Sequence, residues 1–406
     1  MNLLYHVGLS IYWLVILLAS SFQEKARKRI KGSPDWLQQL KAIPPSKSRI
    51  WMHAASYGEF EQGKPVFEEL RRRYPDHYLV LTFFSPSGYE AFKSSDAADL
   101  VLYLPFDFSR NAKRFLTYLK PQVALFVKYE FWLNYLKQAH VLEVPVVYFS
   151  SIFRPSQHFF KPSGKIFRNA LRTVDHFFVQ NEESIALLDS IGIKQVTRIG
   201  DTRVDRVLKV QAEQRSLEGI SAFKGDNKLL VAGSTWLKDE QLLAEWIKNT
   251  SEKVKLIIAP HELDQRRLGE VNLLFPSAGA WSSGGFIQRN ILVMDEMGLL
   301  KYLYAYADYS YVGGGFGKGV HNTLEALVWG SPVFFGPHCD RFEEAKDISR
   351  HDFGGVVRNS VELEQKIQDT LSNNERIKEG IAQYFMVRAG ATEKIVNYLS
   401  GLISDE

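Results

Sequence analysis

Cysteine is nearly absent from this chain, and neither sign of charge is in clear excess. Cys339 is the only cysteine among 406 residues, so no disulfide can form within the chain, and a reducing compartment is expected. A single thiol also gives little support for a metal site or a redox couple. The formal net charge of +4 is too small to indicate nucleic-acid binding by itself, and we expect no nucleic-acid partner.

The chain also lacks low-complexity segments, and its content of 45% hydrophobic and 24% charged residues is typical of a folded globular protein. Its length suits two domains better than one core. Short apolar runs alternate with helical patterns over residues 49–180 and again over 228–336, which predicts α/β domains with doubly wound, Rossmann-like parallel sheets. We place the domains at 23–205 and 206–385, with a C-terminal helix at 386–406 that could pack back on the first domain.

No charged residue occurs between Leu3 and Phe22, a stretch about long enough to cross a bilayer as a helix. A cationic cluster follows it at Lys25, Arg27, Lys28, Arg29 and Lys31. This order predicts a transmembrane anchor at residues 1–22 with the following domains on the cytoplasmic side. The alternatives are a signal peptide, although no basic region precedes the apolar run, and a buried first helix of a soluble domain.

The stretch from Tyr311 to Leu327, YVGGGFGKGVHNTLEAL, has the pattern of a strand, a glycine loop and the start of a helix. Glycines let a backbone approach a ligand closely, and the N–H groups at a helix N-terminus favour a phosphate. Lys318 adds a cation to the loop, and Glu325 could accept hydrogen bonds from a ribose. The alternative is a tight turn between strand and helix with no ligand.

Three further turns are expected at the same edge of the second sheet, namely Ala232–Thr235, Ala259–Glu262 and Asp295–Leu299. Within them, His261 could contact a phosphate or a base, or it could be a structural histidine. Ligands of open α/β sheets bind beyond the carboxyl ends of the strands. Several polar turns at one edge therefore predict a nucleotide pocket.

In the first domain, two acidic residues follow predicted strands. Glu59 comes just after the strand Arg49–Ala55, near a helix N-terminus and facing a possible interdomain cleft, where a carboxylate could be a general base or only a helix cap. Glu130 lies in VKYEFWLN, residues 127–134. It could hold a cation, orient Glu59 or a substrate, or form a buried ion pair with Lys128 or an arginine.

Residues 151–172 interleave four phenylalanines with five cations, which are Arg154, Lys161, Lys165, Arg168 and Arg172. Basic residues mixed with aromatics suit a membrane surface with anionic head groups. Two alternatives stay open: a solvated loop whose aromatics pack on the core, and a site for single-stranded nucleic acid.

A set of motifs in chain order resembles the Kdo (3-deoxy-D-manno-octulosonic acid) transferases of glycosyltransferase family 30. The motifs are HAASYGEF (53–60), TFFSPSGYE (82–90), KYEFWLN (128–134), GST (233–235), DEMGLL (295–300), VGGGFGKGVHNTLEAL (312–327) and GPH (336–338). The resemblance implies a GT-B fold, with two Rossmann-like domains facing a cleft, anchored at the bacterial inner membrane. It also implies metal-independent, cofactor-free, inverting transfer of Kdo from CMP-Kdo to a lipid A precursor in lipopolysaccharide synthesis.

By the resemblance, Glu59 is the general base and Glu130 has a supporting role. We expect the donor to be bound by residues from four turns of the second domain: Ser234, Thr235, His261, Met297, Gly298, Leu299, Gly314, Lys318, Asn322 and Glu325. Candidates for binding the acceptor or a phosphate are Ser56, Gly58, Arg154 and Arg203.

The chain departs from the family pattern at three places. Pro260 and His261 have no arginine between them, Arg203 stands where lysine is common, and the family's tryptophan-glycine and Glu-Arg motif is not evident between Lys25 and Trp36. These departures leave open which cation holds the phosphate or the Kdo carboxylate. A GT-B glycosyltransferase or epimerase that uses a uridine nucleotide sugar, and a non-catalytic membrane-tethered nucleotide-binding protein, are the alternative functions.

Overall fold

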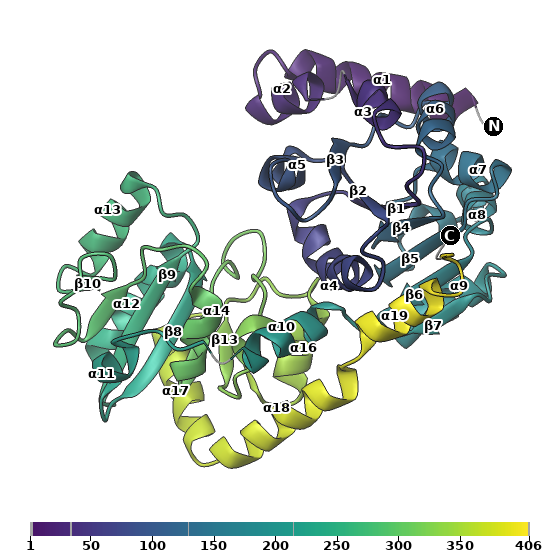
Figure 1. Ribbon diagram of the computed structural model, residues 1–406. Coiled ribbons are helices and arrows are strands. Elements are labelled where there is room, and N and C mark those ends of the chain that lie inside the picture. Colours follow the sequence, from purple (N-terminus) through teal and green to yellow (C-terminus); the bar gives the residue numbers. More distant parts are fainter. Residues whose placement is uncertain (1–2, 33–34, 129, 214, 405–406) are drawn as a thin grey trace. The chain divides into compact units, whose positions relative to one another are not determined.

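The computed structural model describes residues 3–32, 35–128, 130–213 and 215–404, and the chain forms two compact units (Figure 1). The first unit comprises residues 1–205 and 390–406, and the second comprises 206–389. Each unit has a parallel sheet of seven strands among the described residues. Both sheets carry helices, so the expected α/β fold class with two doubly wound domains is confirmed.

The first sheet has the strand order β3-β2-β1-β4-β5-β6-β7. Its neighbouring strands all pair in parallel, so their carboxyl ends meet at one edge. The order reverses between β1 and β4, which is the topological switch point where ligands of such sheets bind. The strands are β1 (Arg49–Ala54), β2 (Tyr78–Phe83), β3 (Leu100–Tyr103), β4 (Val123–Val127), β5 (Val146–Ser151), β6 (His176–Val179) and β7 (Val196–Arg198).

Apolar side chains cover both faces of this sheet, as parallel strands require. One buried cluster includes Trp51, Phe115 and Tyr148, and the other includes Phe60 and Phe67. The helices that supply these clusters are α4 (Tyr57–Arg73), α5 (Pro86–Phe92), α6 (Ser109–Leu119), α7 (Leu133–Val141), α8 (Lys165–Leu171), α9 (Glu182–Ser190) and, from the C-terminus, α19 (Ala391–Leu399).

The C-terminal helix α19 packs against α4. The carboxylate of Asp205 accepts hydrogen bonds from the backbone N–H groups of Gly390 (2.7 Å) and Thr392 (2.6 Å). These are the otherwise unpaired donors at the start of α19, so Asp205 caps the helix. Apolar residues of α19, Ile395 and Leu399 among them, are fully buried in the first unit.

Three helices precede β1, namely α1 (Leu3–Ala19), α2 (Glu24–Lys31) and α3 (Trp36–Lys41). Tyr5 of α1 donates its hydroxyl to Asp107 at 2.5 Å. No single helix in the described part of the chain is long and apolar enough to cross a bilayer, whereas α1 and α2 meet that test only together, with a bend of 114°. The predicted anchor includes Met1 and Asn2, which lie outside the described residues.

In the second unit, the strand order is β10-β11-β9-β8-β12-β13-β14. The strands are β8 (Lys228–Thr235), β9 (Val254–Pro260), β10 (Gly279–Ala280), β11 (Ile291–Val293), β12 (Tyr309–Val312), β13 (Val333–Phe335) and β14 (Gly354–Val356). Strands β9, β8 and β12 are neighbours, so the turns that follow them share one edge. The helices are α10 (Arg203–Ala212), which starts in the first unit, α11 (Ile220–Lys224), α12 (Leu237–Asn249), α13 (Gln265–Leu274), α14 (Leu300–Leu303), α15 (Leu324–Leu327), α16 (Glu343–Arg350), α17 (Ser360–Leu371) and α18 (Asn374–Arg388).

Candidate functional site

Glu59 lies in the first turn of α4, directly beyond the carboxyl end of β1. One of its carboxylate oxygens accepts a hydrogen bond of 2.7 Å from the backbone N–H of Ala55, so the side chain folds back over the end of the strand. Burial raises the pKa of Glu59, while the positive charge of Lys128 and the Ala55 hydrogen bond act in the opposite direction. A partly buried carboxylate of raised pKa is a stronger base than an exposed one.

Glu130 lies beyond β4, the strand next to β1. Burial, and after it the negative charge of Glu59, raises the pKa of Glu130 from 4.5 to about 7. The structure therefore brings the two predicted acidic residues close enough for the charge of Glu59 to affect the ionisation of Glu130. The cation of Lys128, which we considered as a partner for Glu130, lowers the pKa of Glu59.

Three buried contacts hold the segment that carries Glu130. The Tyr148 hydroxyl donates to the carbonyl of Glu130 at 2.9 Å, and the Ser151 hydroxyl donates to the carbonyl of Lys128. The Trp132 indole donates to His53 at 3.2 Å. Sequence reasoning did not single out these partners, and Tyr129 of the motif lies outside the described residues.

His53 is fully buried on β1, and burial lowers its pKa to about 3. Its Nδ1 atom lies 3.1 Å from the carbonyl of Thr82 and 2.9 Å from the Thr82 hydroxyl. Because the indole of Trp132 can only donate, Nε2 of His53 accepts and Nδ1 carries the proton. Both ring nitrogens are therefore satisfied within the protein.

The residues predicted to bind the acceptor or a phosphate differ in how accessible they are to a ligand. Ser56 is the residue before α4 and makes no capping hydrogen bond with its side chain, and a side chain added at Gly58 would meet open space. Arg203 is engaged with Asp201 through its Nε atom at 2.9 Å. Arg154 follows β5, and its guanidinium has no hydrogen-bond partner within the described part of the chain.

The aromatic residues of segment 151–172 point mainly inward. Phe153 and Phe159 are buried in the first unit's core, so for them the alternative of packing on the core is correct. Phe167 is partly buried and makes an edge-to-face contact with Tyr5 of α1, with ring centroids 6.2 Å apart. The cations Lys161 and Lys165 stay exposed.

The glycine loop after β12 packs tightly against the neighbouring strand ends. A Cβ atom at Gly313 would lie 2.3 Å from the carbonyl oxygen of Ser234, and one at Gly315 would lie 2.6 Å from the backbone nitrogen of Gly336. These two glycines therefore serve backbone packing, whereas the sequence predicted close approach to a ligand. Lys318 is exposed on the same loop.

Asp239 of α12 is hydrogen-bonded to the glycine loop. Its carboxylate accepts hydrogen bonds from the backbone N–H groups of Gly314 (3.0 Å) and Trp236 (2.9 Å) and from the Tyr311 hydroxyl (2.8 Å). An acidic residue in the first turn of a helix is a weak sequence signal for this role.

The predicted helix after the glycine loop is much shorter than expected. The helix α15 begins at Leu324 and has only four residues, so the helix N-terminus that we predicted as an anion site is not present at His321. Asn322 donates from its side-chain amide to Glu325 at 3.1 Å and accepts from the backbone N–H of Leu324 at 3.3 Å. The Asn322 side chain thus accepts from the backbone N–H of Leu324, which in a longer helix would donate to a backbone carbonyl instead.

The other predicted donor residues lie at the same edge with different exposure. Ser234 has a left-handed backbone with φ of 53°. Thr235 is fully buried and donates its hydroxyl to Glu240 at 2.8 Å, so that hydroxyl is turned away from solvent. Met297 is 73% exposed, Leu299 is buried, and Gly298 has a φ of 85° in the turn between β11 and α14.

Three rings stack at this edge of the second sheet. The centroids of Trp236 and His261 are 4.9 Å apart, and those of His261 and His321 are 4.3 Å apart with an angle of 20° between the planes. The Trp236 indole donates to Nε2 of His321 at 3.1 Å. The predicted residue His261 thus contacts two further rings, Trp236 and His321, which are hydrogen-bonded to each other and which sequence reasoning did not single out.

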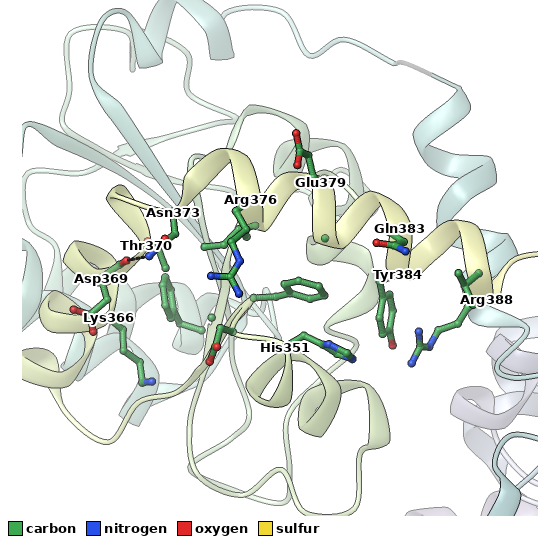
Figure 2. Close-up of a pocket in the computed structure, with 17 residues that line it drawn as sticks. His351, Lys366, Asp369, Thr370, Asn373, Arg376, Glu379, Gln383, Tyr384 and Arg388 are labelled. Carbon is green, nitrogen blue, oxygen red and sulfur yellow. Dashed lines mark hydrogen bonds between the residues drawn. The ribbon is translucent and has the colours of Figure 1, made fainter.

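A cavity of about 760 Å³ lies elsewhere in the second unit, beside the edge strand β14 and helices α17 and α18 (Figure 2). Its charged lining is mixed, with Lys366, Arg376 and Arg388 against Asp352, Asp369 and Glu379. It adjoins the start of β14, which in a parallel sheet is the opposite edge from the glycine loop. The cavity therefore does not coincide with the predicted donor site.

Solved structures of similar fold show which fold the chain has. The UDP-GlcNAc 2-epimerase from Neisseria meningitidis aligns with a TM-score of 0.61 and 16% identity, covering 87% of this chain and all of that one. A glycosyltransferase from Rickettsia africae aligns with a TM-score of 0.60 and 12% identity, covering 89% and 100%. Together with the two parallel sheets, these likenesses identify the fold as GT-B.

Sequence comparisons show similarity to one family. The model of the 3-deoxy-D-manno-octulosonic-acid transferase (kdotransferase) family matches residues 28–206. A 3-deoxy-D-manno-octulosonic acid transferase of Aquifex aeolicus is 27% identical, over 88% of this chain and 95% of its own length, and one of Chlamydia pneumoniae is 28% identical, over 84% and 81%. The chain is a glycosyltransferase related to the Kdo transferases, and the resemblance seen in its motifs is confirmed.

Proposed function

We propose that this protein transfers Kdo from CMP-Kdo to a lipid A precursor such as lipid IVA, with inversion and without a metal. The observation that carries the proposal is the pair of interacting carboxylates, Glu59 and Glu130, beyond the neighbouring strands β1 and β4. The matches to 3-deoxy-D-manno-octulosonic acid transferases support Kdo as the group that is transferred.

Glu59 is the general base of the proposed reaction. Its carboxylate takes the proton of the acceptor hydroxyl as the hydroxyl oxygen forms a bond to the anomeric carbon of Kdo. The bond from that carbon to the phosphate oxygen breaks, and CMP leaves with the electron pair. Burial raises the pKa of Glu59 and so its basicity, while the charge of Lys128 and the Ala55 N–H act in the opposite direction and favour the ionised form, and a general base needs both a raised basicity and an accessible ionised form.

Departure of CMP places negative charge on a phosphate, which a nearby cation stabilises. We assign this role to Lys318, which is exposed on the glycine loop. The loop itself is fixed by Asp239, so its backbone needs little reorganisation when the charge develops. In this scheme the first unit activates the acceptor and the second unit holds the donor.

We also propose that the protein attaches to the cytoplasmic face of the bacterial inner membrane through residues 1–22. Apolar side chains of α1 stay exposed, including Leu4 (75%), Ile11 (57%) and Leu18 (62%). Cations of α2 adjoin them, which suits a surface with anionic head groups.

The test is incubation of the purified, detergent-solubilised protein with CMP-Kdo and a tetraacylated lipid A precursor in the presence of a chelator, followed by mass spectrometry. A gain of one or more Kdo units is expected. If CMP binds but no transfer occurs, the acceptor assignment is wrong. If UDP displaces CMP at equal concentration, a uridine nucleotide sugar replaces CMP-Kdo as the candidate donor.

A further inference from the structure

The ring stack in the second unit joins turns that follow three neighbouring strands. Trp236 follows β8, His261 follows β9, and His321 follows the glycine loop after β12. The backbone N–H of His321 donates to the carbonyl of Gly313 at 3.1 Å, and that of His261 donates to the carbonyl of Thr235 at 3.0 Å. The rings are therefore fixed to the carboxyl edge of the sheet, beside the loop that we assign to the donor.

The hydrogen bond from Trp236 determines which nitrogen of His321 carries the proton. An indole N–H is a donor only, so Nε2 of His321 must accept, and the neutral ring carries its proton on Nδ1. Burial, with the neighbouring His261 ring, lowers the pKa of His321 to about 4. The ring is thus neutral at physiological pH, with a single N–H group at Nδ1.

That N–H group has no hydrogen-bond partner within the described part of the chain, although the ring is only partly exposed. The corresponding ring in the first unit, His53, has its Nδ1 atom within 3.1 Å of the Thr82 carbonyl. A fixed donor without a protein acceptor, at the edge that holds the predicted nucleotide site, is suited to an oxygen of a ligand.

We propose that Nδ1–H of His321 donates a hydrogen bond to an anionic oxygen of the sugar-nucleotide donor, and that Trp236 is a positioning residue that fixes the tautomer. The inference rests on the proposed function, because it takes CMP-Kdo as the ligand. Two oxygens of that donor have the required chemistry, one on the phosphate and one on the Kdo carboxylate.

The test measures binding of CMP and of cytidine to the full-length, detergent-solubilised protein by calorimetry. His321→Ala should weaken CMP binding about 10- to 100-fold, the usual effect of losing a hydrogen bond to a charged group, and leave cytidine binding unchanged. If CMP binding is also unchanged but KM for CMP-Kdo rises by the same factor, the acceptor is the Kdo carboxylate.

Two conservative variants separate this role from a structural one. The amide nitrogen of asparagine takes nearly the position of Nδ1, whereas that of glutamine is nearer to Nε2. His321→Asn should therefore restore most of the affinity, and His321→Gln should not. Trp236→Phe keeps an aromatic ring but removes the indole N–H, and we expect it to weaken CMP binding several-fold without changing the affinity for cytidine.

His351→Ala is the matched control, because it removes an imidazole from the same unit at the separate cavity in Figure 2 and should leave binding at the wild-type level. Unchanged CMP binding and KM in His321→Ala would overturn the inference, as would equal rescue by asparagine and glutamine or a parallel loss of cytidine binding. Failure of the wild-type protein to bind CMP would instead overturn the proposed function itself.

Discussion

Replacing Glu130 with glutamine should make the protein more stable at alkaline pH. The pKa of Glu130 is raised to about 7 in the folded protein, chiefly by burial, so the folded state holds a proton that the unfolded state has already lost. Stability therefore falls as the pH rises from about 4.5 to about 7 and is constant above that range. The glutamine variant keeps the shape of the protonated acid and carries no charge.

The size of this effect follows from the two pKa values. The difference between the usual 4.5 and about 7 corresponds to roughly 3 kcal/mol at about 1.4 kcal/mol per pH unit. We expect Glu130→Gln to raise the free energy of unfolding by up to that amount at pH 8, and to change it little at pH 4.5. The same variant should lower transfer, because the second carboxylate supports the base.

Urea unfolding at pH 4.5 and pH 8 measures the effect. Glu183→Gln is the matched control, because Glu183 is an exposed residue of α9 in the same unit. A Glu130→Gln protein that is less stable than wild type at pH 8, or that gains no more than the control, would refute the argument that an ionised carboxylate is costly at this position.

Three further changes test other parts of the structure. Glu59→Gln should keep CMP binding and lower the transfer rate about 10²- to 10⁴-fold, and turnover within threefold of wild type in the mass-spectrometric assay would exclude the base role. Asp239→Ala leaves three donors unpaired, which are the backbone N–H groups of Gly314 and Trp236 and the Tyr311 hydroxyl. Urea unfolding should therefore show a loss of about 3 kcal/mol or more, and a loss below 1 kcal/mol would show that water replaces the carboxylate. Ile11→Glu with Leu18→Glu on the exposed face of α1 should move the protein from the membrane pellet to the supernatant in fractionation of cells, whereas Val361→Glu, at an apolar site on α17 that is also exposed (74%), should not.

The regular parts of both sheets could be predicted from the sequence because long apolar runs with abrupt ends leave few alternatives. For example, the apolar run Tyr78–Phe84 predicts a strand, and in the structure β2 spans Tyr78–Phe83. The short edge strands β7, β10 and β14 were missed. The pattern of β7 is one partly buried residue followed by two exposed ones, and β10 has only two residues, so neither carries the apolar signal that identifies a strand.

The position of the acidic pair, Glu59 and Glu130, could also be predicted. The strands before them have clear apolar runs, and residues that follow neighbouring parallel strands lie at one edge of the sheet. The partners that hold these residues could not. Asp239 bonds to Gly314, 75 residues further along the chain, and nothing in a polar helix start indicates that distance. At the glycine loop the sequence could not separate two causes, because close approach to the backbone of Gly336 requires the same residue type as close approach to a ligand.

A tryptophan donates to a histidine at the carboxyl edge of each sheet, and the comparison shows what separates a structural ring from a functional candidate. Trp132 bonds to His53 and Trp236 bonds to His321, and burial lowers the pKa of both histidines. His53 has a protein partner for its second nitrogen, so it serves to hold the segment of Glu130 in place. In His321 the indole N–H of Trp236 likewise places the proton on Nδ1. Nδ1 has no hydrogen-bond partner in the described part of the chain, and it is the atom that we propose donates to the ligand. The residue types are the same in the two cases, and the hydrogen bonds of the second nitrogen distinguish them.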